Sequence, residues 1–203
     1  MDFKLTIFSD YICPWCYVGQ GVVEKLSAEY NVEVEWRPYY LHRNTPPEGM
    51  EIPDYIMRAR ANGSEERLQS MAAMYGMNFI SSARIYNTRL AHEATEYARE
   101  YGKASEFHRV VFRKVYGEGQ DISRWDVLRS AAEEVQLNSE DMQQVVESGK
   151  YTASVAEQVQ WAQQIGVTGV PTYVINDKYA IVGAQPYEVF MKALSQINEA
   201  KTV

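Results

Sequence analysis

Two cysteines separated by two residues are the part of this sequence best suited to chemistry. Cys13 and Cys16 enclose Pro14 and Trp15 in a Cys-Pro-Trp-Cys segment, and the 203-residue chain has no other cysteine. Thiols paired at this spacing are typical of redox motifs, whereas disulfide-stabilised scaffolds use more cysteines at wider spacing. We therefore expect Cys13 and Cys16 to be catalytic.

The pair could instead be half of a metal site or two inert thiols. A structural zinc ion takes four ligands, and the chain offers no further cysteine and only three histidines, His42, His92 and His108. The start of a helix is a poor place to bury two unreactive thiols. Redox or thiol-dependent chemistry is the stronger hypothesis, and we expect no metal.

The motif lies between an expected strand and an expected helix. Residues 3–8 alternate apolar and polar side chains as a β-strand does, and apolar residues recur at helical spacing after the motif. Pro14 suits the first helical position, where its missing N–H loses no hydrogen bond. Cys13 then stands exposed at the helix N-terminus, which stabilises a thiolate. Cys16, one turn later, can resolve the mixed disulfide.

The remaining chain indicates an α/β fold interrupted by helices. Residues 32–36 alternate again and complete a strand–helix–strand unit. Residues 151–203 contain a helical stripe, a hairpin with turn residues Asn176 and Asp177, and a last helix. We predict a discontinuous domain formed by residues 1–42 plus 151–203. Residues 43–150, which show helical patterns and no convincing strand, form an inserted helical domain.

A second feature is Gly169-Val170-Pro171-Thr172, just before the last apolar strand. Proline cannot donate to a strand ladder, so Pro171 should lie at the start of that strand. Cis is the minor state of an X–Pro bond. The sequence alone therefore leaves both isomers of the Val170–Pro171 bond open.

Composition excludes several other roles. The formal charge of −7, from 20 basic and 27 acidic residues, argues against non-specific nucleic-acid binding. No segment approaches the roughly 18 uninterrupted apolar residues of a membrane span. The first ten residues, MDFKLTIFSD, are too short an apolar stretch and too charged for a secretion signal. We expect a cytoplasmic protein that binds neither nucleic acid nor membranes.

The sequence resembles a known family. The segments SDYICPWCYVG, WRPYYL, NTRLAHE, EGQDIS, GVTGVPTYVI and VGAQPYEVF, in this order over nearly the whole chain, are similar to DsbA-like thioredoxin-superfamily oxidoreductases of FrnE type. That family is similar in turn to class kappa glutathione transferases and 2-hydroxychromene-2-carboxylate isomerases. The resemblance implies a thioredoxin-like fold with a helical domain inserted into it, as in DsbA.

The resemblance also implies roles for residues outside the motif. It implies that the Val170–Pro171 bond is cis and lies beside Cys13, so that the Val170 backbone pairs with an extended peptide or with glutathione. Pro14, Trp15 and Pro171 would support the thiols. By analogy alone, Asn87 and His92 of the NTRLAHE segment would face the cleft and bind substrate, although Asn87 also suits a helix cap.

Three functions follow from these observations. The first is a protein disulfide oxidoreductase with no tightly bound cofactor, acting on peptide or protein thiols and disulfides or on glutathione as co-substrate. The second is a glutathione-dependent isomerase or transferase acting on a small aromatic or polyketide-like compound. Some relatives have a serine in place of the first cysteine, and Cys13 favours the first function. The third is a peptide-binding module, which leaves the cysteine spacing unexplained. Related proteins also suggest a homodimer.

Overall fold

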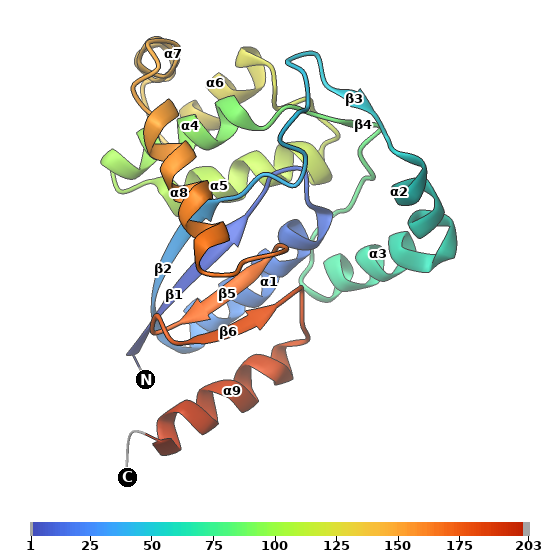
Figure 1. Cartoon of the computed structure of the whole chain (residues 1–203), viewed down its shortest axis with the longest axis vertical. Helices are drawn as coiled ribbons and strands as arrows, with labels where there is room; N and C mark the ends of the chain where they lie inside the picture. The colour runs from blue at the N-terminus through green and yellow to red at the C-terminus, as the bar shows by residue number, and fades with distance from the viewer. Residues whose placement is uncertain (1, 201–203) are drawn as a thin grey trace.

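The computed structural model describes residues 2–200, which form a four-stranded sheet surrounded by helices (Figure 1). The strands lie in the order β2-β1-β5-β6, and β1 runs parallel to β2 and antiparallel to β5. Their bounds are β1 Asp2–Ser9, β2 Asn31–Pro38, β5 Thr172–Ile175 and β6 Tyr179–Val182. Leu5, Ile7 and Phe8 on β1 are fully buried. A strand buried on both faces is expected at the centre of a sheet.

Helices cover both faces of this sheet. Val22 and Leu26 of α1 (Pro14–Glu29) and Phe190 of α9 (Tyr187–Ala200) join one core with Leu5 and Ile7. On the opposite face, α8 (Thr152–Gln164) packs Ala162 against Phe8. The predicted strand–helix–strand unit is confirmed, and it places the Cys-Pro-Trp-Cys segment at the junction of β1 and α1.

The predicted hairpin at the other end of the chain is also present. Asn176 and Asp177 have φ values of +52° and +55°, and the Lys178 N–H donates to the Ile175 carbonyl at 3.1 Å. Left-handed conformations at both central positions define the turn whose twist suits a two-strand hairpin. The Asn176 side chain accepts a hydrogen bond from the Lys4 N–H at 3.0 Å, which ties the turn to β1.

The intervening segment is mainly helical and gathers at one end of the sheet, away from α9 (Figure 1). Its elements are β3 Met50–Glu51, α2 Asp54–Ala59, η1 Arg60–Ser64, α3 Glu65–Met74, β4 Arg84–Ile85, α4 Arg89–Glu100, α5 Ala104–Phe112, η2 Arg113–Gly117, α6 Trp125–Glu134 and α7 Ser139–Glu147. The strand pair β3–β4 differs from the expectation that this segment has no strand. Strands of two residues are too short to show alternation in a sequence.

The helical segment and the sheet unit share a core. Cys13 and Cys16 belong to the same buried cluster as Phe112, Tyr116 and other residues of the helical segment. The division into a domain of residues 1–42 plus 151–203 and an insertion of residues 43–150 stays a prediction. None of the helices within residues 2–200 has the length and apolarity needed to cross a bilayer.

Candidate active site

Cys13 caps the N-terminus of α1. Its φ and ψ of −92° and 108° are extended, and the helix begins at Pro14 as the sequence predicts. The Cys13 N–H donates to the Asp10 carbonyl at 2.9 Å, and the Cys13 carbonyl accepts from the Cys16 N–H at 3.0 Å. Cys13 therefore occupies the N-cap position of α1, and its side chain makes no capping hydrogen bond to the first turn.

The second predicted feature lies directly against this cysteine. The Cys13 thiol donates to the Val170 carbonyl oxygen at 3.5 Å, and the Val170–Pro171 peptide bond is cis. Pro171 immediately precedes β5, where a missing N–H does not break the ladder. The structure thus brings Cys13 next to the Val170–Pro171 bond, which lies more than 150 positions away in sequence.

Cys13 lines a cavity of about 310 Å³ together with Pro14 and Trp15. The facing walls come from the helical segment, chiefly residues 52–60 and 81–85 with Leu68, Phe79 and Tyr116. Most of these side chains are apolar, and Arg60 and Arg84 supply positive charge. The cavity therefore offers an apolar ligand access to the Cys13 thiol.

The expectation that Cys13 stands exposed is wrong for this conformation, because only 3% of the residue is exposed. Residues of α2 and η1 line the cavity opposite Cys13 and cover the helix N-terminus. The motif itself carries no signal for this cover, since it is supplied by residues 40 to 50 positions away. The cavity of about 310 Å³ is the space that the structure leaves next to Cys13.

Cys16 lies in a different environment. It is 1% exposed, and its pKa is raised well above the ordinary value by burial first and then by the hydrogen bond with Cys13 and the charge of Cys13. Hydrogen bonds with the Asp10 backbone and the Ser9 side chain act in the opposite direction. A protonated, buried Cys16 is suited to act second, after Cys13 has reacted.

Comparison with known proteins agrees with this geometry. Residues 4–195 match the DSBA-like thioredoxin domain family. The chain belongs to this family. It is 32% identical to the uncharacterised protein YwbO of Bacillus subtilis, over 99% of this chain and 100% of that protein. Membership in the DSBA-like family establishes the thioredoxin fold and indicates oxidoreductase activity in general.

Two further relatives are similar over most of their length. The crystal structure of a probable DsbA oxidoreductase from Streptomyces coelicolor has 28% identity and a TM-score of 0.87, covering 96% of this chain and 89% of that one. A 2-hydroxychromene-2-carboxylate isomerase of Pseudomonas putida is 23% identical over 84% of each chain. The DSBA-like fold is thus shared by proteins named for two different reactions.

A buried carboxylate, Asp10, fixes the loop between β1 and the Cys-Pro-Trp-Cys segment. Asp10 accepts hydrogen bonds from the Leu41 N–H at 2.8 Å and from the Thr88 hydroxyl at 2.9 Å. These bonds connect the end of β1 to the connection after β2 and to the start of α4. Sequence reasoning missed Asp10, although an acidic residue directly after an apolar strand and three positions before Cys13 was a usable signal.

Neither Asn87 nor His92 reaches the Cys13 cavity, whose described lining includes neither residue. The Asn87 amide donates to the Thr45 carbonyl at 2.6 Å, and its oxygen accepts from the Arg89 N–H at 3.0 Å. His92 is buried with Nε2 3.4 Å from the Asp10 carboxylate. Both side chains hold the loops around the motif, so these positions give no support to the predicted substrate contacts.

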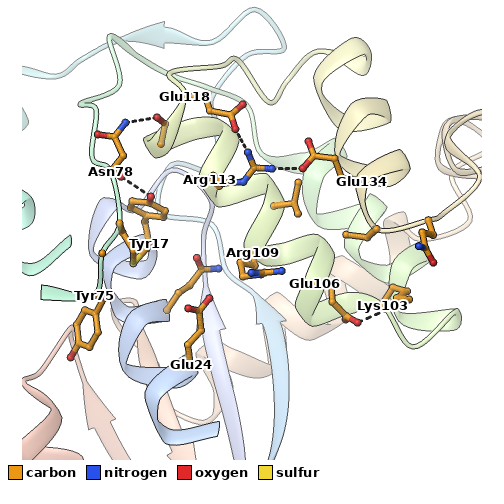
Figure 2. A pocket seen from close by; sticks show the side chains of 17 residues that line it. Tyr17, Glu24, Tyr75, Asn78, Lys103, Glu106, Arg109, Arg113, Glu118 and Glu134 are labelled. Carbon is orange, nitrogen blue, oxygen red and sulfur yellow. Dashed lines mark hydrogen bonds and ion pairs between the residues drawn. The ribbon is translucent and has the colours of Figure 1, made fainter. Parts of the chain in front are cut away.

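A larger cavity, of about 710 Å³, opens between α1 and the α5–η2 segment (Figure 2). Figure 2 shows Arg113 at its rim, ion-paired with both Glu118 and Glu134. Its described lining includes neither cysteine. Size alone would select this cavity, whereas the thiol chemistry selects the smaller one.

Within residues 2–200, no group of three or more histidine, cysteine or carboxylate side chains is arranged to hold a metal ion. Pro14 and Trp15 line the cavity next to Cys13, and their expected role in supporting the thiols stays a prediction. Cys13 and Cys16 are both free thiols.

Proposed function

We propose that this chain is a thiol–disulfide oxidoreductase of DsbA/FrnE type, in which Cys13 attacks the substrate disulfide and Cys16 resolves the intermediate. The observation that carries the proposal is the asymmetry of the pair. Cys13 lines a cavity at a helix N-terminus, whereas Cys16 is buried behind it. An attacking thiolate needs access to substrate, but a resolving thiol needs access only to its partner.

The reaction consists of two exchanges. The Cys13 thiolate attacks one sulfur of the substrate, forming a mixed disulfide and releasing the first substrate thiolate. Cys16 then loses its proton and attacks the Cys13 sulfur, which releases the second thiolate and leaves a Cys13–Cys16 disulfide. The substrate disulfide gains two electrons and the cysteine pair loses two. Both steps run in reverse when the pair oxidises a dithiol.

Binding of the substrate is proposed to use the Val170 backbone and the cavity wall. The Val170 carbonyl already contacts the Cys13 sulfur, so an extended peptide or glutathione lying along residues 169–171 would bring its own sulfur to Cys13. Trp15 would contact the apolar part of the same substrate. This arrangement suits peptide or protein thiols and glutathione equally.

Single-cysteine variants test the proposal. Cys13→Ser should reduce exchange with glutathione disulfide to the uncatalysed rate. Cys16→Ser should stop after the first exchange and accumulate the mixed disulfide, seen by intact mass spectrometry as one added glutathionyl group per chain. Wild-type rates in both variants would overturn the proposal.

A glutathione-dependent isomerase or transferase is the second candidate. The cavity of about 310 Å³ falls at the lower end of the range for small-molecule sites, about 300–1,000 Å³, and its walls are mostly apolar. A named isomerase is among the relatives. The decisive measurement is turnover of 2-hydroxychromene-2-carboxylate with glutathione by the Cys16→Ser variant, because isomerisation does not need a resolving thiol.

A cytoplasmic location is also part of the proposal, together with its consequence for the resting state. In a reducing compartment the Cys13/Cys16 pair rests mainly as the dithiol, so the protein would reduce substrates there. An equilibrium titration of the pair against glutathione redox buffers gives its potential. A potential far above that of the buffer would instead favour an oxidant role.

A further inference from the structure

The cavity beside Cys13 carries positive charge and no negative charge. Its described lining contains two arginines, Arg60 and Arg84, and one histidine, His42, but no aspartate or glutamate. The chain as a whole has the opposite balance, with 27 acidic and 20 basic residues. Pockets for small ligands are mostly apolar, and their few polar or charged groups fix the orientation of the ligand. The charged groups of this lining are therefore informative about what binds beside Cys13.

The two arginines of the lining differ in their partners. Arg84 Nη1 lies 2.8 Å from a carboxylate oxygen of Glu51, so the charge of Arg84 is balanced within the chain. Arg60 Nη2 donates to the Ser82 carbonyl at 3.0 Å, and no other hydrogen bond or ion pair joins this guanidinium to the residues that the structure describes. A guanidinium has five N–H donors in a planar fork. Arg60 therefore keeps donors and an unbalanced charge for a ligand.

The position of Arg60 on its helix places it in the wall of the cavity. Ile56, Ala59 and Arg60 all line the cavity, at the spacing of three and four residues that defines one face of a helix. Arg58, between them, is exposed and does not belong to the described lining. The hydrogen bond to Ser82 holds the Arg60 guanidinium against a second part of the wall. Because Arg60 is partly buried, solvent ions screen its charge less than that of an exposed arginine.

The volume of the cavity limits the size of the ligand. An apolar cavity of about 150 Å³ is large enough for benzene, and the cavity beside Cys13 has about 310 Å³. One aromatic ring with small substituents therefore fits there. A carboxylate on such a ring would bind Arg60, since a guanidinium and a carboxylate form two parallel, charge-assisted hydrogen bonds.

We propose that Arg60 is a specificity-determining residue, which binds a carboxylate of the substrate while Cys13 attacks the substrate sulfur. The inference rests on the proposed disulfide-exchange function and adds a substrate class to it, namely small disulfides whose apolar body carries a carboxylate. In the step concerned, the Cys13 thiolate forms a bond to one substrate sulfur and the substrate sulfur–sulfur bond breaks. The other sulfur leaves with the electron pair as a thiolate.

Two aromatic disulfides that differ in charge test the proposal. One is a symmetric nitrophenyl disulfide with a carboxylate on each ring, and the other has each carboxylate replaced by a carboxamide. The thiolate that each disulfide releases absorbs visible light, which gives the second-order rate constant of attack by Cys13. In Arg60→Gln we expect this rate constant to fall about tenfold or more for the carboxylate disulfide, the effect of losing a hydrogen-bonded charge pair, and less than about twofold for the carboxamide.

Arg58→Gln is the matched control, because it removes the same charge from the same helical segment outside the described lining. Both rate constants should stay within about twofold of the wild-type values, as expected for an exposed charge. Three results would overturn the inference: wild-type rates in Arg60→Gln, equal losses for the two disulfides in Arg60→Gln, or equal losses in Arg58→Gln and Arg60→Gln.

A ligand without sulfur separates binding from exchange. In Cys16→Ser, where Cys13 is the remaining thiol, 2-nitrobenzoate should slow the alkylation of Cys13 by iodoacetamide more than 2-nitrobenzamide does. Adding Arg60→Gln should abolish this difference, as measured by mass spectrometry. Equal protection by the two compounds before that substitution, or none, would overturn the inference while leaving the proposed function intact. Attack on either disulfide by Cys13→Ser at the wild-type rate would instead overturn the proposed function.

Discussion

The two ends of the Cys-Pro-Trp-Cys segment face opposite kinds of surroundings. On the Cys13 side lies an apolar cavity whose far wall comes from α2 and η1. Cys16, one helical turn later, is only 1% exposed, and burial raises the pKa of its thiol well above the ordinary value. Two cysteines one helical turn apart can therefore have different roles, because their surroundings differ. Cys13 has a cavity beside its thiol, whereas Cys16 is enclosed in the buried core.

The difference between the two surroundings is tested most directly by measuring the reactivity of each thiol alone. In Cys16→Ser, a small alkylating reagent should modify Cys13 through the cavity. In Cys13→Ser, we expect Cys16 to react slower by a factor on the order of a thousand at neutral pH, because burial raises its pKa and closes its access. The rates can be followed by mass spectrometry. Equal rates would show that the two environments do not differ functionally.

The second prediction concerns Asp10, which holds the loop between the two environments. Asp10→Ala leaves the Leu41 N–H and the Thr88 hydroxyl without their buried partner. We expect the free energy of unfolding to fall by about 3 kcal/mol in urea titrations. Glu51→Ala, which breaks an exposed pair with Arg84, should cost about 0.5 kcal/mol or less. Similar losses in both variants would refute the structural role of Asp10.

A third prediction concerns only the cavity beside Cys13. Ala59→Trp on α2 places a large side chain in the lining of the Cys13 cavity. We expect Cys13 to attack a symmetric aromatic disulfide about tenfold more slowly, since the space for the aromatic ring is reduced. The rate is followed by the absorbance of the first thiolate that is released. Ala61→Trp, two residues on and outside the described lining, serves as the control. Release of the second thiolate, which follows attack by Cys16, should proceed at the wild-type rate in both variants.

The fourth and smallest effect is the pH dependence of stability that comes from His108, a buried histidine on α5. The pKa of His108 is lowered in the folded protein, so the unfolded chain binds its proton first as the pH falls. The stability due to neutral His108 is present above about pH 6.5 and is lost below it, by at most about 1.4 kcal/mol per pH unit. Urea titrations between about pH 7.5 and 5.5 measure this slope. It should shrink in His108→Leu and persist in His42→Asn, whose ring is only half-buried.

Much of the fold could be predicted from short-range patterns. Alternation gave β1 and β2, and Pro14 gave the first residue of α1, because these signals are local steric and hydrogen-bonding preferences. Asn176 and Asp177 gave the hairpin turn for the same reason. The pair β3–β4 was missed because two residues carry no period.

The site was predicted less completely. The cis bond before Pro171 came from the family resemblance, since the sequence alone left the isomer open. Asn87 and His92 were assigned to the cleft by analogy, and the structure places them at loop contacts instead. His108 gave no usable signal, because a single histidine on a helix shows nothing of what faces it in the folded chain.

The sequence by itself determined the reactive groups: two thiols three positions apart at the start of a helix, which local geometry brings to one end of one turn. Only the tertiary structure decided which surroundings each thiol meets. The cavity wall comes chiefly from residues 52–60, the carbonyl beside Cys13 from Val170, and much of the buried core around Cys16 from the helical segment. These contacts join segments up to 157 positions apart, and no local pattern specifies which distant side chain will fill a given place in a packed core.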